Sequence, residues 1–203
     1  MKNLLKVILL VVAFATLSFV SSNKETITVV IDAGHGGHDF GANHEEHFEK
    51  DLVTSISKKI VAMNSDKNIE ILFTRDDDQF LGLSERTNYI NKVKPDLVIS
   101  LHVNKNKNAS TNGFEIYVSD QSVAYKKSSE LAQKLVTGLE KNTPLQNRGV
   151  KLAPFWILKK SEVPSLVLEL GFLSNENDRK YITSEDGQSK ISQAIIDFIA
   201  TLN

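Results

Sequence analysis

Two histidines and two glutamates occupy positions from which side chains commonly do chemistry. His35 follows a β-branched apolar run and is bracketed by glycines, and His102 ends a second apolar run. Glu169 lies inside a third such run, where an unpaired carboxylate is costly to bury, and Glu49 begins a helical segment after the loop that follows His35. Two imidazoles and one carboxylate form a three-ligand zinc set with a fourth position left to water, and the remaining carboxylate would be the general base.

Short apolar runs that alternate with helical patterns predict the elements that present these residues. The predicted strands span residues 26–33, 69–75, 96–103, 113–119, 155–159 and 165–170. Apolar residues at helical spacing predict helices over 52–60, from near Ser122 through 131–139, and over 191–202, and Ser84 begins a shorter one. This alternation indicates an α/β fold in a single domain, with a mostly parallel, twisted sheet of about six strands and helices on both faces. Ligands gather at the carboxyl ends of such strands, where His35 and His102 are expected.

The first 22 residues have the pattern of a secretory signal peptide. Lys2 and Lys6 precede an apolar run that is interrupted only by Thr16 and Ser18 and is followed by small residues. The run is shorter than the roughly 20 apolar residues of a membrane span. We expect an exported protein that acts in the periplasm or the extracellular cell wall, with residues 1–22 cleaved or retained as an N-terminal anchor and residues 23–203 forming the catalytic domain.

Composition narrows the function further. The chain has no cysteine, which excludes disulfides, thiolate metal sites and lipid attachment through an N-terminal cysteine. It has 24 Lys and Arg against 25 Asp and Glu, and two of the lysines lie in the leader, so the remainder is slightly acidic. This balance argues against a nucleic-acid partner.

Four ordered motifs carry a family resemblance. They are IDAGHGG (31–37), EKD (49–51), SLHVN (100–104) and VPSLVLELGFLSN (163–175). Together they resemble the zinc-dependent N-acetylmuramoyl-L-alanine amidases of the amidase 3 type, which are cell-wall hydrolases. The resemblance implies His35, Glu49 and His102 as Zn²⁺ ligands and Glu169 as the catalytic residue. The implied substrate is peptidoglycan, cleaved between N-acetylmuramic acid and the L-alanine of the stem peptide.

Further positions match the family without a fixed role. Four residues are candidates for substrate binding: Asn104, Arg86, Arg148 and Asn175. Thr74-Arg75 and the Arg-Gly-Val run at 148–150 are expected to be structural or to face the substrate. The chain departs from the family at Phe40, where proline is usual, and in the segment 44–47, which offers extra ligands but is not an H-E-x-x-H motif.

Each role has a plainer alternative. His35 could cap a helix or bond to a loop, and Glu49 could be an acid favoured at a helix N-terminus. Glu169 could form an ion pair with Arg148 or Arg86. His38 could replace a ligand, whereas His44 and His47 are most simply part of a solvated loop.

Two other functions compete with an amidase. One is an exported zinc carboxypeptidase or endopeptidase acting on cell-wall peptides, which the absence of a His-x-x-Glu pair at His35 disfavours. The other is a catalytically inactive activator of amidase shape, which the intact set of four chemical residues disfavours. We expect a monomer. We also expect that it needs no activator, because residues 120–122 lead directly from a strand into a helix. That connection is too short for a helix that would cover the zinc, as occurs in some relatives.

Overall fold

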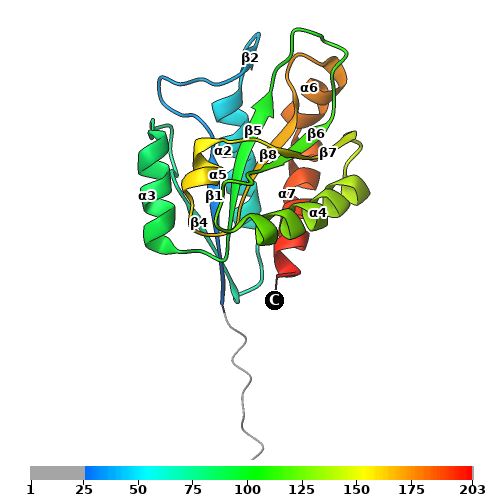
Figure 1. Cartoon of the computed structure of the whole chain (residues 1–203). Helices are drawn as coiled ribbons and strands as arrows, with labels where there is room; N and C mark the ends of the chain where they lie inside the picture. The colour runs from blue at the N-terminus through cyan, green and yellow to red at the C-terminus, as the bar shows by residue number, and fades with distance from the viewer. Residues whose placement is uncertain (1–25, 203) are drawn as a thin grey trace, which may run out of the picture.

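The computed structural model describes residues 26–202 of the chain. Six strands form one sheet in the order β4-β1-β5-β8-β6-β7 (Figure 1). Along the chain they are β1 Ile27–Ala33, β4 Ile69–Phe73, β5 Leu97–Asn104, β6 Phe114–Val118, β7 Asn147–Leu152 and β8 Ser165–Phe172. β6 is antiparallel to β8 and parallel to β7, and the other neighbouring pairs are parallel. The prediction of one α/β domain with a mostly parallel six-stranded sheet is confirmed.

Helices cover both faces of this sheet (Figure 1). One face packs against α2 (Glu49–Met63), α4 (Tyr125–Asn142) and α7 (Glu185–Ala200), and the other against α3 (Leu83–Val93) and α5 (Trp156–Lys160). Successive residues of a strand point to opposite faces, so Val29 and Ile31 enter the larger core while Val30 enters the smaller one. α6 (Glu176–Thr183) follows β8 and contacts α7. The four predicted helices correspond to α2, α3, α4 and α7.

One predicted element is wrong, and several observed elements have no counterpart among the predicted ones. The apolar run 155–159 is not a strand, because Phe155 is the N-cap of the short helix α5, which places Ile157 and Leu158 in the smaller core. The edge strand β7 was not predicted, because its sequence NRGVKL lacks an apolar run and its residues are only partly buried. Helix α6 was not predicted either, nor was the hairpin of β2 (Asn43–His44) and β3 (His47–Phe48).

The connection from β6 to α4 and the two ends of the described region bear on the expectations from the sequence. Residues 119–124 join β6 directly to α4, so no helix intervenes there. The proposed leader, residues 1–22, lies outside the described residues. Within residues 26–202, no helix combines the length and the apolar character that a bilayer crossing requires.

Candidate metal centre and active site

His35 lies in the loop that leaves β1 at the carboxyl end of the sheet. Its backbone has a φ of 58°, and the neighbouring Gly36 and Gly37 also have positive φ, which lets the chain turn sharply here. The ring Nδ1 lies 2.8 Å from Asp39 Oδ2. That contact fixes the orientation of the ring and leaves Nε2 directed at Glu49, 3.2 Å from Oε2.

His102 comes from the next strand of the sheet. It lies near the end of β5, and its Nδ1 is 2.9 Å from Glu49 Oε1. The ring packs against Gly34: a Cβ added to Gly34 would lie 2.4 Å from His102 Cε1. Glycine is therefore required at this position so that the β1 loop and the His102 ring can approach each other.

Glu49 joins the two histidines. It is the first residue of α2 and is buried, and its carboxylate also accepts hydrogen bonds from the backbone N–H groups of Val103 (3.0 Å) and Ala42 (2.6 Å). Burial would raise the pKa of Glu49, but the hydrogen bonds and charges of His102 and His35 lower it to about 2. The pKa of His35 is raised to about 9, because Glu49 and Asp39 outweigh its burial. Glu49 therefore stays ionised between the two histidines, and its negative charge favours a cation at this point.

The spacing of these groups fits a tetrahedral metal ion. One donor atom from each of His35, Glu49 and His102 lies within 4.8 Å of the others. Ligand atoms about 2.1 Å from a tetrahedral zinc are about 3.4 Å apart, and the two imidazole nitrogens lie at a similar distance, 3.2 Å and 2.9 Å, from the two different oxygens of Glu49. The three residues could hold a metal ion with little rearrangement.

Glu169 stands beside these three side chains. It is the register partner of His102 on β5 and of Glu115 on β6, so the three side chains share one face of the sheet. Its Oε2 atom is buried and has no hydrogen-bond partner among the described residues. Burial, together with the charges of Glu49 and Glu115, raises its pKa to about 7 against the opposing effect of His102. A carboxyl group with this pKa can exchange a proton near neutral pH.

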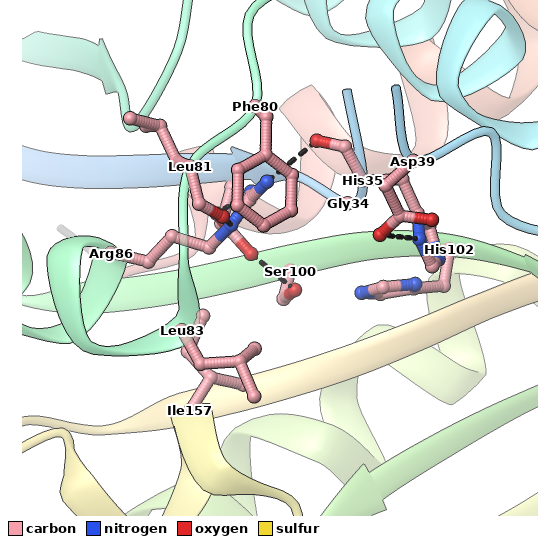
Figure 2. A pocket seen from close by; sticks show the side chains of 11 residues that line it. Gly34, His35, Asp39, Phe80, Leu81, Leu83, Arg86, Ser100, His102 and Ile157 are labelled. Carbon is pink, nitrogen blue, oxygen red and sulfur yellow. Dashed lines mark hydrogen bonds and ion pairs between the residues drawn. The ribbon is translucent and has the colours of Figure 1, made fainter. Parts of the chain in front are cut away.

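Two buried arginines hold the loop that carries His35. Arg86 donates to Asp32 Oδ1 (2.7 Å) and to the carbonyl oxygens of Ala33 (2.7 Å) and His35 (2.6 Å), as part of the network in Figure 2. Arg75 donates to the carbonyl oxygens of Ala33 and Gly34. Both arginines thus donate to the backbone of the β1 loop and position His35, and neither forms an ion pair with Glu169.

Arg148 belongs to a second charged cluster next to Glu169. Arg148 Nε and Lys151 Nζ each lie 2.5 Å from Glu115 Oε1, and Tyr117 donates to Glu115 Oε2 at 2.5 Å. These contacts lower the pKa of Glu115 despite its burial. Arg148 therefore pairs with Glu115, and the predicted alternative of an ion pair to Glu169 is not formed.

The other predicted residues lie around this centre in different roles. Asn175 is the N-cap of α6, where its side chain accepts from the N–H groups of Asn177 and Asp178. Asn104 ends β5, and its side chain accepts from the N–H of Lys105. His38 lies against Phe80 with ring centroids 4.3 Å apart, and His44 and His47 face each other in the β2–β3 hairpin. None of these histidines belongs to the metal-ligand group found within residues 26–202.

Three residues of the site were not anticipated from the sequence. Asp39 lies four positions after His35, a spacing that could have suggested a contact. Glu115 and Tyr117 alternate with apolar residues in β6, so a charged residue within a strand was the available signal. Their shared face with Glu169 depends on the antiparallel pairing of β6, which local pattern does not reveal.

Two cavities open beside these residues. The first, about 370 Å³, is lined on one side by His35, His102 and Asp39 and on another by Leu83 and Ile157 (Figure 2). The second, about 320 Å³, reaches His35, His102 and Glu169, and its remaining lining is apolar: Leu83, Phe155, Trp156, Ile157 and Val167. A substrate therefore has access to the carboxyl edge of the sheet.

Comparisons with a family model and with known proteins point to the same family. Residues 29–201 match the Amidase_3 model, described as N-acetylmuramoyl-L-alanine amidase. The chain is 36% identical over 172 residues to the uncharacterised protein YqiI of Bacillus subtilis, covering 85% of this chain and 82% of YqiI. It is 34% identical over 171 residues to the N-acetylmuramoyl-L-alanine amidase LytC of Bacillus subtilis, covering 84% of this chain but only 34% of LytC.

A solved structure extends this likeness to the fold. The CwlD amidase of Clostridioides difficile, in complex with the GerS lipoprotein, matches with a TM-score of 0.80 at 28% identity, over 86% of this chain and 97% of the CwlD chain. The family model covers nearly all of the described residues, and the CwlD chain has the same fold over most of them. This chain therefore belongs to the N-acetylmuramoyl-L-alanine amidase family of hydrolases.

Proposed function

We propose that this protein is a zinc-dependent N-acetylmuramoyl-L-alanine amidase acting on peptidoglycan. The bond cleaved is the amide between the lactyl group of N-acetylmuramic acid and the L-alanine of the stem peptide. The observation that carries the proposal is the convergence of His35, Glu49 and His102 beside the unpartnered carboxylate oxygen of Glu169. Family membership supports the same reaction.

His35, Glu49 and His102 are the proposed zinc ligands. When bound there, zinc would acidify a water molecule and polarise the scissile carbonyl group. Glu49 offers a carboxylate that stays ionised, and Asp39 holds the His35 ring so that Nε2 remains directed at the site. These contacts fix the donor atoms before a cation arrives.

Glu169 is the proposed general base and acid. Its carboxylate takes a proton from the attacking water while the water oxygen bonds to the carbonyl carbon. As the carbon–nitrogen bond breaks, Glu169 passes that proton to the departing alanine nitrogen, so the amine leaves in neutral form. A pKa raised to about 7 and the absence of a partner on Oε2 among the described residues suit this double use. A bound cation would lower that pKa, which favours the ionised form needed to accept the proton.

Binding of the stem peptide is proposed for the side of Glu169 that faces β7. Arg148 and Lys151 are partly exposed there, and together they carry one more positive charge than the Glu115 carboxylate between them can neutralise. Stem peptides carry carboxylate groups, which these cations can attract. Asn104, at the end of β5, remains a candidate for substrate contact, whereas Arg86 and Asn175 are assigned to positioning the β1 loop and α6.

Zinc content and activity, measured together, test this function. The wild-type chain should bind about one zinc ion and release stem peptides from purified peptidoglycan, and His102→Ala should lose both properties. Glu169→Gln should keep the zinc and lose at least about 10²-fold in rate. Cleavage within the stem peptide would instead identify a carboxypeptidase or endopeptidase. Full zinc content without any cleavage would identify an inactive relative.

We also propose that the zinc site is open and that the protein needs no activator. The direct connection from β6 to α4 through residues 119–124 supports this proposal, because it leaves no segment there to cover the site. Purified residues 23–203 with zinc alone should digest peptidoglycan as a monomer. Activity that appears only after an envelope protein is added would refute this proposal.

Export to the periplasm or the extracellular cell wall is part of the same proposal. Peptidoglycan lies outside the cytoplasmic membrane, and the first 22 residues have the pattern of a signal peptide. Amino-terminal sequencing of the secreted protein would show whether this leader is cleaved or retained.

A further inference from the structure

An apolar ledge borders the proposed active site and extends from β6 to the start of α3. It consists of Leu83 at the start of α3 and of Phe155 and Trp156 at the start of α5, with exposed fractions of 57%, 41% and 42%. These three side chains line the same cavity as His102 and Glu169. Large apolar side chains gathered next to a polar site are unusual on a solvated surface and indicate a contact with a ligand.

Packing holds the ledge in place. The Phe155 ring lies 5.1 Å from the Tyr117 ring, and Lys160 Nζ lies 5.4 Å from the centre of the Trp156 ring. Next to them, Ile157 is buried in the smaller core. The aromatic residues are therefore anchored at their base while part of each remains open to solvent, as in preformed recognition surfaces.

The two sides of Glu169 differ in charge. On one side β6 and β7 present Glu115, Arg148 and Lys151. The ledge begins at Phe155, against Tyr117 of β6, and leads away from this cluster to Leu83 at the start of α3, which lies on the other side of β8 (Figure 1). In the proposed substrate the lactyl carboxyl group is consumed in the scissile amide, so the glycan half is uncharged, while the peptide half carries carboxylates. An uncharged sugar ring has apolar C–H faces that can lie on aromatic and aliphatic side chains.

We propose that the ledge formed by Leu83, Phe155 and Trp156 binds the glycan strand of peptidoglycan, so that the substrate crosses the site with sugars on α3 and α5 and the stem peptide toward β7. This inference rests on the proposed function, because it assigns the two halves of that substrate. It makes the ledge a determinant of specificity for amides attached to a sugar chain.

The sequence provides a direct probe, since Trp156 is the only tryptophan in the chain. The ligand is a tetrasaccharide of alternating N-acetylglucosamine and N-acetylmuramic acid whose lactyl carboxyls are capped as methyl amides. Binding is measured on the zinc-loaded Glu169→Gln chain, in which turnover is suppressed. The tetrasaccharide should change Trp156 fluorescence saturably, and the dipeptide L-alanyl-D-isoglutamine should not.

Two variants separate the ledge from general surface effects. Leu83→Ala removes part of the ledge but keeps the fluorophore, and it should weaken tetrasaccharide binding at least about fivefold. Val123→Ala truncates another exposed aliphatic residue, 85% exposed and in the connection before α4, and it should leave binding unchanged. Equal binding by the Leu83→Ala and Val123→Ala chains would overturn the inference.

The remaining outcomes distinguish this inference from the proposed function. A fluorescence change with the dipeptide and none with the tetrasaccharide would overturn the inference, because the ledge would then hold the peptide half. No change with either ligand, while the wild-type chain still cleaves peptidoglycan, would overturn it and leave the proposed function intact. Saturable tetrasaccharide binding without any amide cleavage would support the ledge as a glycan site and refute the proposed function.

Discussion

Replacing Gly34 by alanine is expected to displace His102 and weaken zinc binding. The added Cβ would lie 2.4 Å from His102 Cε1 and 2.7 Å from Nδ1, whereas ordinary contact begins at about 3.4 Å. The ring must therefore withdraw by about 1 Å, while zinc ligands keep their distances within about 0.2 Å. The backbone at Gly34 itself can accept alanine, because its φ lies outside the left-handed range.

The size of the effect follows from this displacement. Overpacking of this kind costs about 1–3 kcal/mol of stability in the zinc-free chain. Zinc affinity should fall about 10- to 100-fold, the range typical of disturbed ligand orientation. Amide hydrolysis at limiting zinc should fall in parallel, because the same ring would position the metal.

Gly138→Ala is the matched control for this substitution. Gly138 lies within α4, and a Cβ added there would have the Ala194 carbonyl oxygen as its nearest neighbour at 3.7 Å, an ordinary contact. Alanine should stabilise this helix by about 0.5–1 kcal/mol and leave zinc binding unchanged. Isothermal titration with zinc and urea unfolding measure both quantities. Wild-type zinc affinity in the Gly34→Ala chain would refute the assigned packing of His102 and its role as a ligand.

Three further changes test other parts of the site. Asp39→Asn should lower zinc affinity about 10- to 100-fold by loosening His35, with competition against a chelator as the measurement; unchanged affinity would remove Asp39 from this role. Arg86→Met should cost about 3–5 kcal/mol in urea unfolding, because it leaves the Asp32 carboxylate buried without its cation; an unshifted midpoint would contradict this. Arg86 and hydrogen bonds outweigh burial and keep the pKa of Asp32 below its ordinary value of 3.8. Ionised Asp32 should therefore contribute its full stabilisation above about pH 4 and lose it as the pH falls toward the lowered pKa. The free energies of unfolding of the Asp32→Asn and wild-type chains should converge in acid, and a difference that stays constant with pH would refute this.

Much of the fold could be predicted from the sequence because its buried elements carry strong patterns. The strands β1, β5 and β8 are nearly continuous apolar runs, as expected for parallel strands covered on both faces. Helix α2 shows its apolar residues at a spacing of four. The edge strand β7 has no such pattern, and the five residues of α5 are too few to distinguish a helix from a strand.

The residues of the candidate site could likewise be predicted only where the local sequence carries a clear pattern. His35, His102 and Glu169 could be singled out from their places in apolar runs, whereas the assignment of Glu49 as a ligand and Glu169 as the base depended on the family resemblance. An acid at a helix start, such as Glu49, usually interacts with the helix dipole. The role of Arg86 could not be predicted, since the Asp32 carboxylate and the carbonyl oxygens of Ala33 and His35 that it contacts lie about 50 positions away along the chain. Such contacts are set by tertiary packing and not by local sequence.

The products of peptidoglycan digestion test the central claim most directly. Zinc-loaded wild-type protein is incubated with purified peptidoglycan, and the released fragments are identified by mass spectrometry together with their new amino termini. The proposed function predicts stem peptides that begin with a free L-alanine amine, glycan strands with free lactyl carboxyls, and no release after chelation or in the Glu169→Gln chain. Peptides cut at an internal bond, or the same products from the chelated protein, would contradict it.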